Sequence, residues 1–161
     1  MKLSMTYSVK IKRLNHIFMD TVRLYRQAVS FFMDVCLQEW DTISSGKCQK
    51  ERVNLVESFT VASKKNPSVP YDFGADFYKF PSYLRRAAIA EALGKVSSYR
   101  SNLAGWEAAD PASRGEKPGL PQAGIVYPAM YRENMFIRTS TYQAALKVFI
   151  RNTWDWILVD L

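Results

Sequence analysis

Apolar and polar residues alternate near the start of the chain, and this pattern predicts a β-strand. The apolar side chains fall on every second position: Met5, Tyr7, Val9 and Ile11. A period of two is typical of a strand with one buried face, and the polar positions between them include Lys10 and Lys12. We therefore expect residues 5–12 to form a half-buried strand with a basic outer face.

Apolar residues then recur every three or four positions, which is the period of an α-helix. A first helix is predicted from Asn15, a residue suited to cap it, to about Ile43, and a second from about Gln49 to Ser63. The core stripe of the first helix consists of Phe18, Val22, Tyr25, Val29, Phe32, Cys36 and Trp40. Residues 67–79 are rich in proline and aromatic side chains, so we expect this connection to pack across the helices.

Residues 80–106 predict a third helix with three different faces. Its core stripe is Leu84, Ala88, Ala92, Val96, Tyr99, Leu103 and Trp106. A second stripe holds only small residues: Ala87, Ala90, Gly94, Ser97 and Ser101. Basic residues flank both stripes. Small residues let another backbone approach closely, and that backbone is either a second helix or a sugar–phosphate chain; this stretch alone favours helix–helix packing.

Strand patterns return in the last third of the chain. Residues 110–124 are rich in proline and glycine and predict an irregular segment. Residues 134–138 and 142–150 are the next candidate strands, and 151–153 is short enough for a hairpin turn. A last strand is expected over residues 154–161.

Together these patterns predict an α+β fold, in which a small antiparallel β-sheet or partial barrel is interrupted by a helical bundle. We divide the chain into a first strand (1–14), a helical domain (15–110), and a loop with the returning strands (111–161). Because the strand pattern still runs at Leu161, we expect either a longer protein or a partner chain that covers the sheet edge.

The charge balance narrows the choice of partner. The 161 residues include 22 Lys and Arg against 15 Asp and Glu, a formal net charge of +7, and the pI is near 9.5. Such a balance favours an acidic partner, of which nucleic acid is the commonest. No apolar run approaches the roughly 18 residues of a membrane span. Two cysteines without a pairing pattern fit a reducing compartment, so we expect a cytoplasmic protein with no membrane partner.

The residue types needed for catalysis are sparse. His16 is the only histidine, Cys36 and Cys48 lack zinc-ligand spacing, and no P-loop or dinucleotide fingerprint is present. The carboxylates lie among basic or polar neighbours, without a pair placed for acid–base work. We therefore predict no catalytic residue and no metal ligand here, and we expect His16 to be a surface residue. Tyrosines interleaved with lysines and arginines instead suggest nucleic-acid binding.

Several segments resemble TnpB-type (OrfB) transposon nucleases, the compact relatives of type V CRISPR effectors. Residues 80–103 (FPSYLRRAAIAEALGKVSSYRSNL) resemble the recognition-lobe helix, and 115–121 (GEKPGLP) resembles the Gly-Lys-x-x-Gly-Phe-Pro loop that follows it. Residues 127–134 and 145–156 resemble the returning strands of the wedge domain. Leu120 stands where that loop usually has an aromatic residue.

The resemblance implies a wedge domain interrupted by a helical recognition domain, which together form the front part of an RNA-guided DNA endonuclease. Such a module would bind guide RNA, the guide–target heteroduplex and a DNA motif beside the target. The nuclease of that family is a RuvC-like domain with an Asp-Glu-Asp site for Mg²⁺, and this sequence lacks it. The implied partners are therefore guide RNA, target DNA and a RuvC-like nuclease domain or chain, and no cofactor is expected in this chain.

The cation pattern and the resemblance together select candidate nucleic-acid-binding residues: Lys10, Lys12, Arg13, Tyr83, Arg85, Arg86, Lys95, Arg100, Lys117, Arg132, Arg138, Lys147 and Arg151. Two other interpretations stay open. One is a stand-alone DNA- or RNA-binding regulator, and the other is a helical protein-interaction scaffold whose basic charge is incidental.

Overall fold

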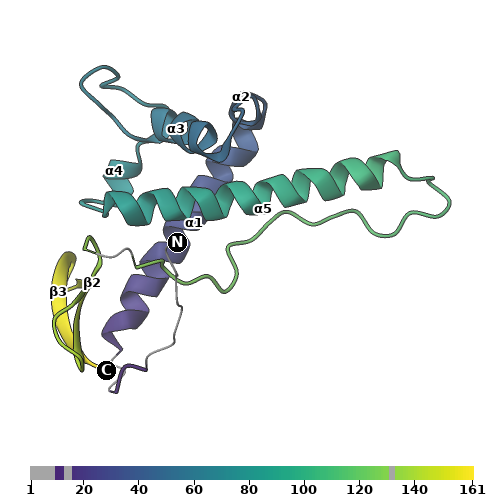
Figure 1. The fold of residues 1–161 in the computed structure, drawn as a ribbon. Helices are drawn as coiled ribbons and strands as arrows, with labels where there is room; N and C mark the ends of the chain where they lie inside the picture. The colour runs from purple at the N-terminus through teal and green to yellow at the C-terminus, as the bar shows by residue number, and fades with distance from the viewer. Residues whose placement is uncertain (1–9, 13–15, 131–132) are drawn as a thin grey trace, which may run out of the picture. The chain divides into compact units, whose positions relative to one another are not determined.

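A computed structural model describes residues 10–12, 16–130 and 133–161, and these residues group into two units (Figure 1). The sheet unit combines Met1–Thr21 with Met130–Leu161, and the helical unit is Val22–Ala129. Helices and an antiparallel sheet in separate parts of the chain confirm the predicted α+β class. Across the described residues the sheet is three-stranded and is not closed into a barrel.

The sheet contains β1 (Phe136–Arg138), β2 (Gln143–Ile150) and β3 (Thr153–Asp160), in the order β1-β2-β3. All neighbours are antiparallel, and the predicted strands are confirmed with shifts of one or two residues at their ends. Arg151 and Asn152 connect β2 to β3 with φ angles of 49° and 62°. Two successive residues with positive φ are the geometry of a tight hairpin turn whose twist matches that of the strands.

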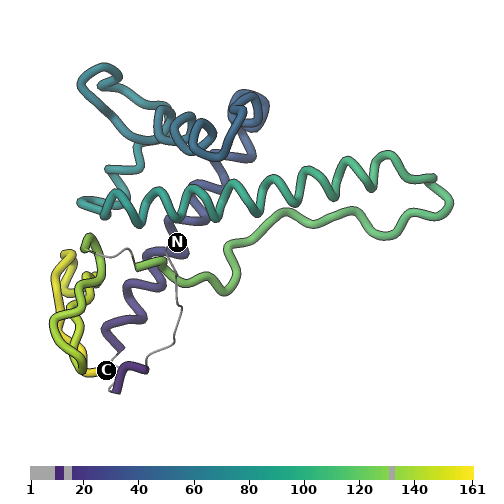
Figure 2. The backbone as a smooth tube through the Cα atoms, viewed as in Figure 1, coloured from purple at the N-terminus to yellow at the C-terminus, as the bar shows by residue number. Residues whose placement is uncertain are grey.

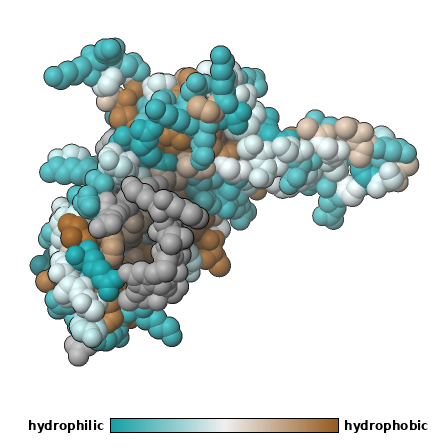
Figure 3. All heavy atoms as spheres, in the orientation of Figure 1, coloured by the Kyte–Doolittle hydropathy of each residue, from teal (hydrophilic) through white to brown (hydrophobic). Residues whose placement is uncertain are grey.

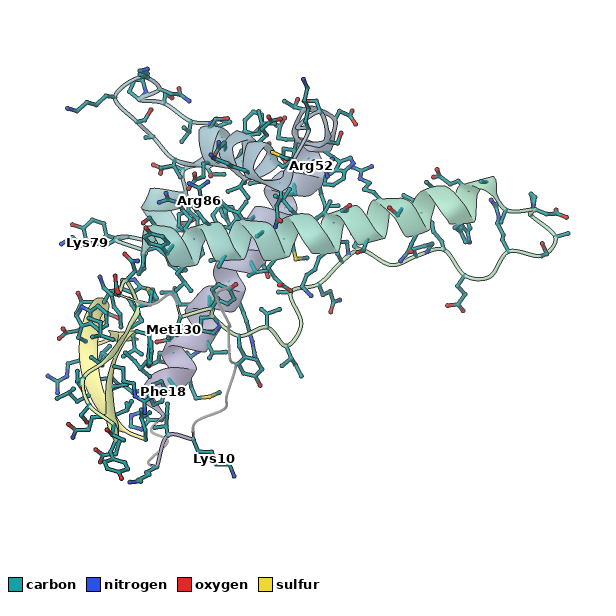
Figure 4. The ribbon with its side chains drawn as sticks, in the orientation of Figure 1. Lys10, Phe18, Arg52, Lys79, Arg86 and Met130 are labelled. Atoms are coloured by element: carbon teal, nitrogen blue, oxygen red, sulfur yellow. The ribbon has the colours of Figure 1, made fainter. Side chains whose placement is uncertain are left out.

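One face of the sheet holds the core of the sheet unit. The alternation predicted for the second strand places Ala144, Leu146 and Val148 on this face, where Val159 of β3 joins them. Partly buried apolar side chains pack against this cluster: Ile11, Phe18, Met130, Phe136, Ile150, Ile157 and Leu161. Figure 4 labels two of them, Phe18 on α1 and Met130 at the start of the returning chain.

The predicted first strand is only partly visible. Residues 5–9 lie outside the described residues, as does the predicted cap Asn15. Residues 10–12 are not assigned to a strand. Nevertheless, the Lys12 amide donates a hydrogen bond of 3.0 Å to the Asp160 carbonyl, so this segment runs beside the end of β3.

Helix α1 (Ile17–Gln38) begins in the sheet unit and supplies a hydrogen bond that the sheet lacks. The pairing of β1 with β2 ends at Leu146, and one residue farther the Lys147 amide still donates to the Met135 carbonyl at 2.8 Å. The next amide on this edge, that of Phe149, has no strand partner. Thr21 is 1% exposed, and its Oγ1 accepts the Phe149 amide at 2.8 Å. The buried hydroxyl of Thr21 thus supplies the acceptor that a neighbouring strand would otherwise provide.

The predicted core stripe of the first helix is confirmed at Tyr25, Val29, Phe32 and Cys36, which are all buried. The prediction of one helix to Ile43 is wrong, because α1 ends at Gln38 and a short α2 (Trp40–Ser44) follows. Residues distant in sequence form hydrogen bonds with the chain at the break between α1 and α2. Arg100 Nη2 donates to the Leu37 carbonyl at 3.0 Å, and the Tyr71 hydroxyl lies 2.9 Å from Glu39 Oε1.

Helix α3 (Gln49–Thr60) ends three residues before the predicted Ser63, and a short α4 (Phe73–Asp76) lies in the aromatic connection. Asp72 caps α4 by accepting the Gly74 and Ala75 amides. The expected packing of this connection across the helices is confirmed by a cluster of aromatic rings with centroids 4.5 to 5.9 Å apart: Phe31, Phe32, Phe73, Phe77 and Phe80.

Helix α5 (Ser82–Ala108) is buried only in its first half. Its buried side chains are Leu84, Ala88, Ile89, Ala92, Leu93 and Val96. The prediction that the core stripe continues through Tyr99, Leu103 and Trp106 is wrong, because these side chains are only half-buried. The segment that runs along the second half of α5 is not a helix but the returning chain, residues 109–129 (Figure 2). Trp106 Nε1 donates to the Gly115 carbonyl in this segment at 2.7 Å.

Replacing Thr21 with valine tests the bond between α1 and β2. The change keeps the shape of the side chain but leaves the Phe149 amide without its acceptor, so we expect the free energy of unfolding to fall by about 1–3 kcal/mol. Chemical denaturation measures this loss. Thr42→Val, at an exposed position of α2, is the matched control and should change stability by less than about 0.5 kcal/mol. Equal effects of the two changes would contradict the assigned role of Thr21.

Candidate nucleic-acid interface

The arginines at the start of α5 bind side chains of α3. Arg85 donates from Nε and Nη2 to Glu57 Oε1 at 3.2 and 2.9 Å, and both side chains are 20% exposed. Arg86 Nη2 donates to Asn54 Oδ1 at 3.0 Å, and its Nη1 lies 3.7 Å from Glu57 Oε2. Figure 4 labels Arg86 where α5 faces α3. These contacts join the two helices, although Arg86 keeps 44% of its side chain exposed.

Other candidate cations of the helical unit also have contacts within the chain. Lys95 Nζ lies 3.5 Å from Glu91 Oε1, one turn earlier on α5. Arg100 binds the Leu37 carbonyl, and its buried Nε has no acceptor among the described residues. Lys117 Nζ lies 6.0 Å from the centre of the Trp106 ring. Tyr83, the aromatic candidate in the first turn of α5, is 48% exposed.

A groove lies beside two residues of the small-residue stripe of α5, Ala90 and Gly94. It has a volume of about 640 Å³ and is bounded by α5 and residues 118–122. Its lining includes Gly94, Lys95, Ser98, Asn102 and Gln122. An added Cβ at Gly94 would meet no atom of another segment within 4 Å. The close helix–helix packing that the stripe predicted is therefore not formed at this position, and polar side chains and small residues border an open groove instead.

The candidate cations of the sheet unit have different surroundings. Three ion pairs join described residues, and all three lie in the helical unit. Within the described part of the sheet unit, no carboxylate lies at ion-pair distance from the following residues: Lys10, Lys12, Lys147 and Arg151. Lys10 extends away from the chain in Figure 4. These four cations are therefore available for an external anion.

Two further candidates of the sheet unit have other partners. Arg138 donates from Nε to the Ser140 carbonyl at 3.2 Å and from Nη2 to the Thr141 carbonyl at 2.8 Å. Lys12 Nζ also lies 5.8 Å from the centre of the Tyr142 ring. Arg13 and Arg132 lie outside the described residues, so their predicted role stays a prediction.

The excess of positive charge is concentrated in the sheet unit. Its two segments, residues 1–21 and 130–161, contain eight Lys and Arg against four Asp and Glu. The helical unit is twice as long and contains 14 basic against 11 acidic residues. In Figure 3 the visible face of the helical unit is largely hydrophilic, with apolar patches between its helices. Its charges are many, but they nearly balance.

Histidine, cysteine and acidic side chains are the groups that could bind a metal ion. No group of three or more His, Cys, Asp or Glu side chains within them is placed to hold a metal ion. His16 is exposed as predicted. Burial raises the pKa of the Cys36 thiol to about 12, so this thiol stays protonated and is a poor nucleophile. The hydrogen bond to Glu39 raises the pKa of Tyr71, which keeps the phenol in its donor form.

Sequence reasoning missed two arrangements of aromatic and basic side chains. The Arg114 guanidinium lies 4.0 Å from the centre of the Trp106 ring, and Trp156 stands directly opposite Lys147 across the β-hairpin. The second could have been found from the alternation, because the two-residue turn determines which residues of the strands face each other. The first depends on how the loop after α5 returns, for which the sequence has no periodic signal.

No helix among the described residues is both long enough and apolar enough to cross a membrane.

Gly94→Ala tests whether the groove along α5 is open. Because the new methyl group meets no other segment, we expect the lower entropy of the unfolded chain to raise the free energy of unfolding by about 0.5–1 kcal/mol. Gly46→Ala is the contrasting control, because a Cβ there would lie 2.8 Å from Arg52 Cγ, and it should destabilise the fold. Thermal melting compares the two variants. A loss of stability in Gly94→Ala would restore the packing interpretation.

Glu57→Gln tests whether the arginines of α5 bind nucleic acid. The change removes the carboxylate shared by Arg85 and Arg86, so we expect the free energy of unfolding to fall by about 1 kcal/mol. If the released arginines contact phosphate, RNA affinity should rise more than in Glu107→Gln, which adds the same charge at an exposed position. Filter binding measures both variants at one salt concentration. Equal affinities would assign these arginines to the fold alone.

Comparisons with known proteins identify a family. The Aq_aa04 family profile matches residues 5–150. The chain is similar to the "Uncharacterized protein aq_aa04" of Aquifex aeolicus (strain VF5), with 28% identity over 125 residues, which are 68% of each chain. No solved structure matches. Neither description names an activity, a ligand or a partner. Because the match covers most of the sequence, this chain belongs to the Aq_aa04 family.

Proposed function

We propose that this chain is a nucleic-acid recognition module that binds structured RNA, and that it serves a TnpB-like RNA-guided DNA endonuclease. The observation that carries the first part is a set of sheet-unit cations without a carboxylate partner in the part of the chain that the structure describes: Lys10, Lys12, Lys147 and Arg151. The second part rests on the resemblance of residues 80–103 and 115–121 to the recognition lobe of that family.

The two units differ in how many of their cations are already paired with carboxylates, and this difference affects how well each unit can bind phosphate. A cation already paired with a carboxylate loses part of that pairing when it binds phosphate, whereas an unpaired exposed lysine only releases water and the phosphate's counterions. Lys10, Lys12 and Arg151 are exposed. They are therefore the better phosphate ligands, and we assign the first contact with RNA to the sheet unit.

In the proposed assembly the helical unit meets the guide–target duplex and the flanking DNA. Arg86 is 44% exposed and Tyr83 is 48% exposed, so both side chains at the start of α5 can reach a ligand. The groove beside Gly94 brings Lys95 and polar side chains to an open surface of α5. Cleavage belongs to a RuvC-like partner that supplies the Mg²⁺ site, as a separate domain or chain.

One observation favours the protein-scaffold alternative. The segment after α5 exposes three large apolar side chains: Leu120, Ile125 and Tyr127, which are 69%, 79% and 70% exposed. Exposed apolar side chains along an extended segment are typical of a protein-binding surface. Arg26 holds part of this segment through a 3.1 Å bond to the Val126 carbonyl. A scaffold would bind its partner with little dependence on salt, and a nucleic-acid module would not.

The test compares two triple variants with equal loss of charge. Lys10→Gln, Lys12→Gln and Arg151→Gln remove unpaired cations of the sheet unit. Lys47→Gln, Lys50→Gln and Lys65→Gln remove exposed cations of the helical unit and are the matched control. We expect the parent chain to bind structured RNA with a steep salt dependence. The first variant should flatten the slope of log affinity against log salt by about two to three, because each lost phosphate contact removes about 0.7–0.9.

The control variant should retain most of that slope. Equal losses in the two variants would show that only net charge matters and would contradict the assignment to the sheet unit. Salt-independent binding, or none, would contradict the proposed function and favour the scaffold. Sequencing of the RNA that co-purifies with the chain separates the remaining possibilities, because one defined guide-like RNA supports the nuclease assembly and a mixed population supports a stand-alone regulator.

A further inference from the structure

The sheet has a second face that the core does not use, which we call the outer face. On β3 the alternation places Trp156 and Leu158 there, and on β2 it places Lys147 there. β1 contributes Ile137, which pairs with Ala145 of β2. The exposed fractions are 40% for Ile137, 37% for Trp156 and 67% for Leu158.

This composition is unusual for the solvent side of an antiparallel sheet. Such a face normally carries polar residues, because large apolar side chains left in water contribute nothing to folding. Here the hairpin register places Lys147 opposite Trp156 and Ala145 opposite Leu158. Trp154 and Phe149 form an edge-to-face pair at the turn end of the same face, with ring centroids 5.5 Å apart. The apolar residues therefore form one continuous surface with a lysine in it.

The charges on this face indicate which ligand it suits. Lys147 lies near the middle of β2 on this face, and Arg151 lies in the turn at the end of the hairpin. Neither has a carboxylate partner among the described residues. The one carboxylate that the alternation places on this face is Asp160, at the far end of β3, and it accepts a 3.2 Å bond from Gln143 Nε2. Aromatic and apolar side chains next to unpaired cations complement bases linked to phosphates, because rings stack on bases and cations bind the backbone.

We propose that the outer face binds unpaired bases of a single-stranded RNA segment, with Trp156 as the stacking side chain and Lys147 and Arg151 as phosphate ligands. This inference rests on the proposed function. It adds that the bound RNA segment is single-stranded and that the outer face is the surface that binds it. A duplex presents its bases at the edge and not at the face, so the outer face discriminates against paired RNA.

The experiment uses the full chain with two RNA probes of equal length, an unstructured oligouridine and a hairpin duplex. Trp156→Val introduces a β-branched residue that suits a strand and removes the ring. Trp156→Phe keeps a smaller ring in place. We expect Trp156→Val to weaken oligouridine binding about tenfold and to leave hairpin binding within about twofold. Trp156→Phe should retain most of the affinity for oligouridine. Lys147→Gln should weaken oligouridine binding and reduce its salt dependence.

Thermal melting of each variant separates loss of binding from loss of the fold. If the parent chain binds neither probe, both the proposed function and this inference are overturned. If the parent binds RNA and Trp156→Val binds oligouridine as the parent does, the proposed function stands and this inference is overturned. If Trp156→Val instead abolishes self-association of the parent chain, seen as a concentration-dependent mass in size-exclusion chromatography with light scattering, the outer face is a protein interface and the inference is wrong.

Discussion

The register of the β2–β3 hairpin is the constraint on which the sheet unit depends. Arg151 and Asn152 form its turn with positive φ angles, and this turn aligns the two strands over their whole length. Because side chains alternate between the faces, a slip of one residue would move every apolar side chain of the core to the opposite face. The same turn therefore determines both which side chains are buried, such as Leu146, and which lie on the opposite face, such as Trp156.

The core face of the sheet depends in turn on α1. β1 is too short to pair with the whole of β2, and Thr21 accepts the amide that this leaves exposed. A strand edge with free amides invites pairing with other chains. The helix therefore blocks part of that edge and at the same time places Phe18 against the core. The hydroxyl of Thr21 thus contributes to the stability of the fold and also removes a free amide at which another chain could pair with β2.

The helical unit uses its cations differently from the sheet unit. Glu57 holds two arginines of α5, and Arg100 binds the carbonyl near the end of α1. These cations stabilise contacts between the helices. In the sheet unit the described lysines have no such role. The two units therefore differ in how their cations are paired, because the arginines of the helical unit bind groups of the chain and the described lysines of the sheet unit have no carboxylate partner among the described residues.

The sequence alone determined the class of the fold, the existence of α1, α3 and α5, and the two faces of β2, because periods of two and of three to four residues follow from backbone geometry. It did not determine where α1 ends, since the partners at that break, Arg100 and Tyr71, lie far along the chain. Nor did it show that a loop, and not a helix, runs along the second half of α5, because an apolar stripe looks the same in both cases. Which cations are paired was also decided by the tertiary structure alone, since a charge's partner depends on distances through space that the order of residues does not contain.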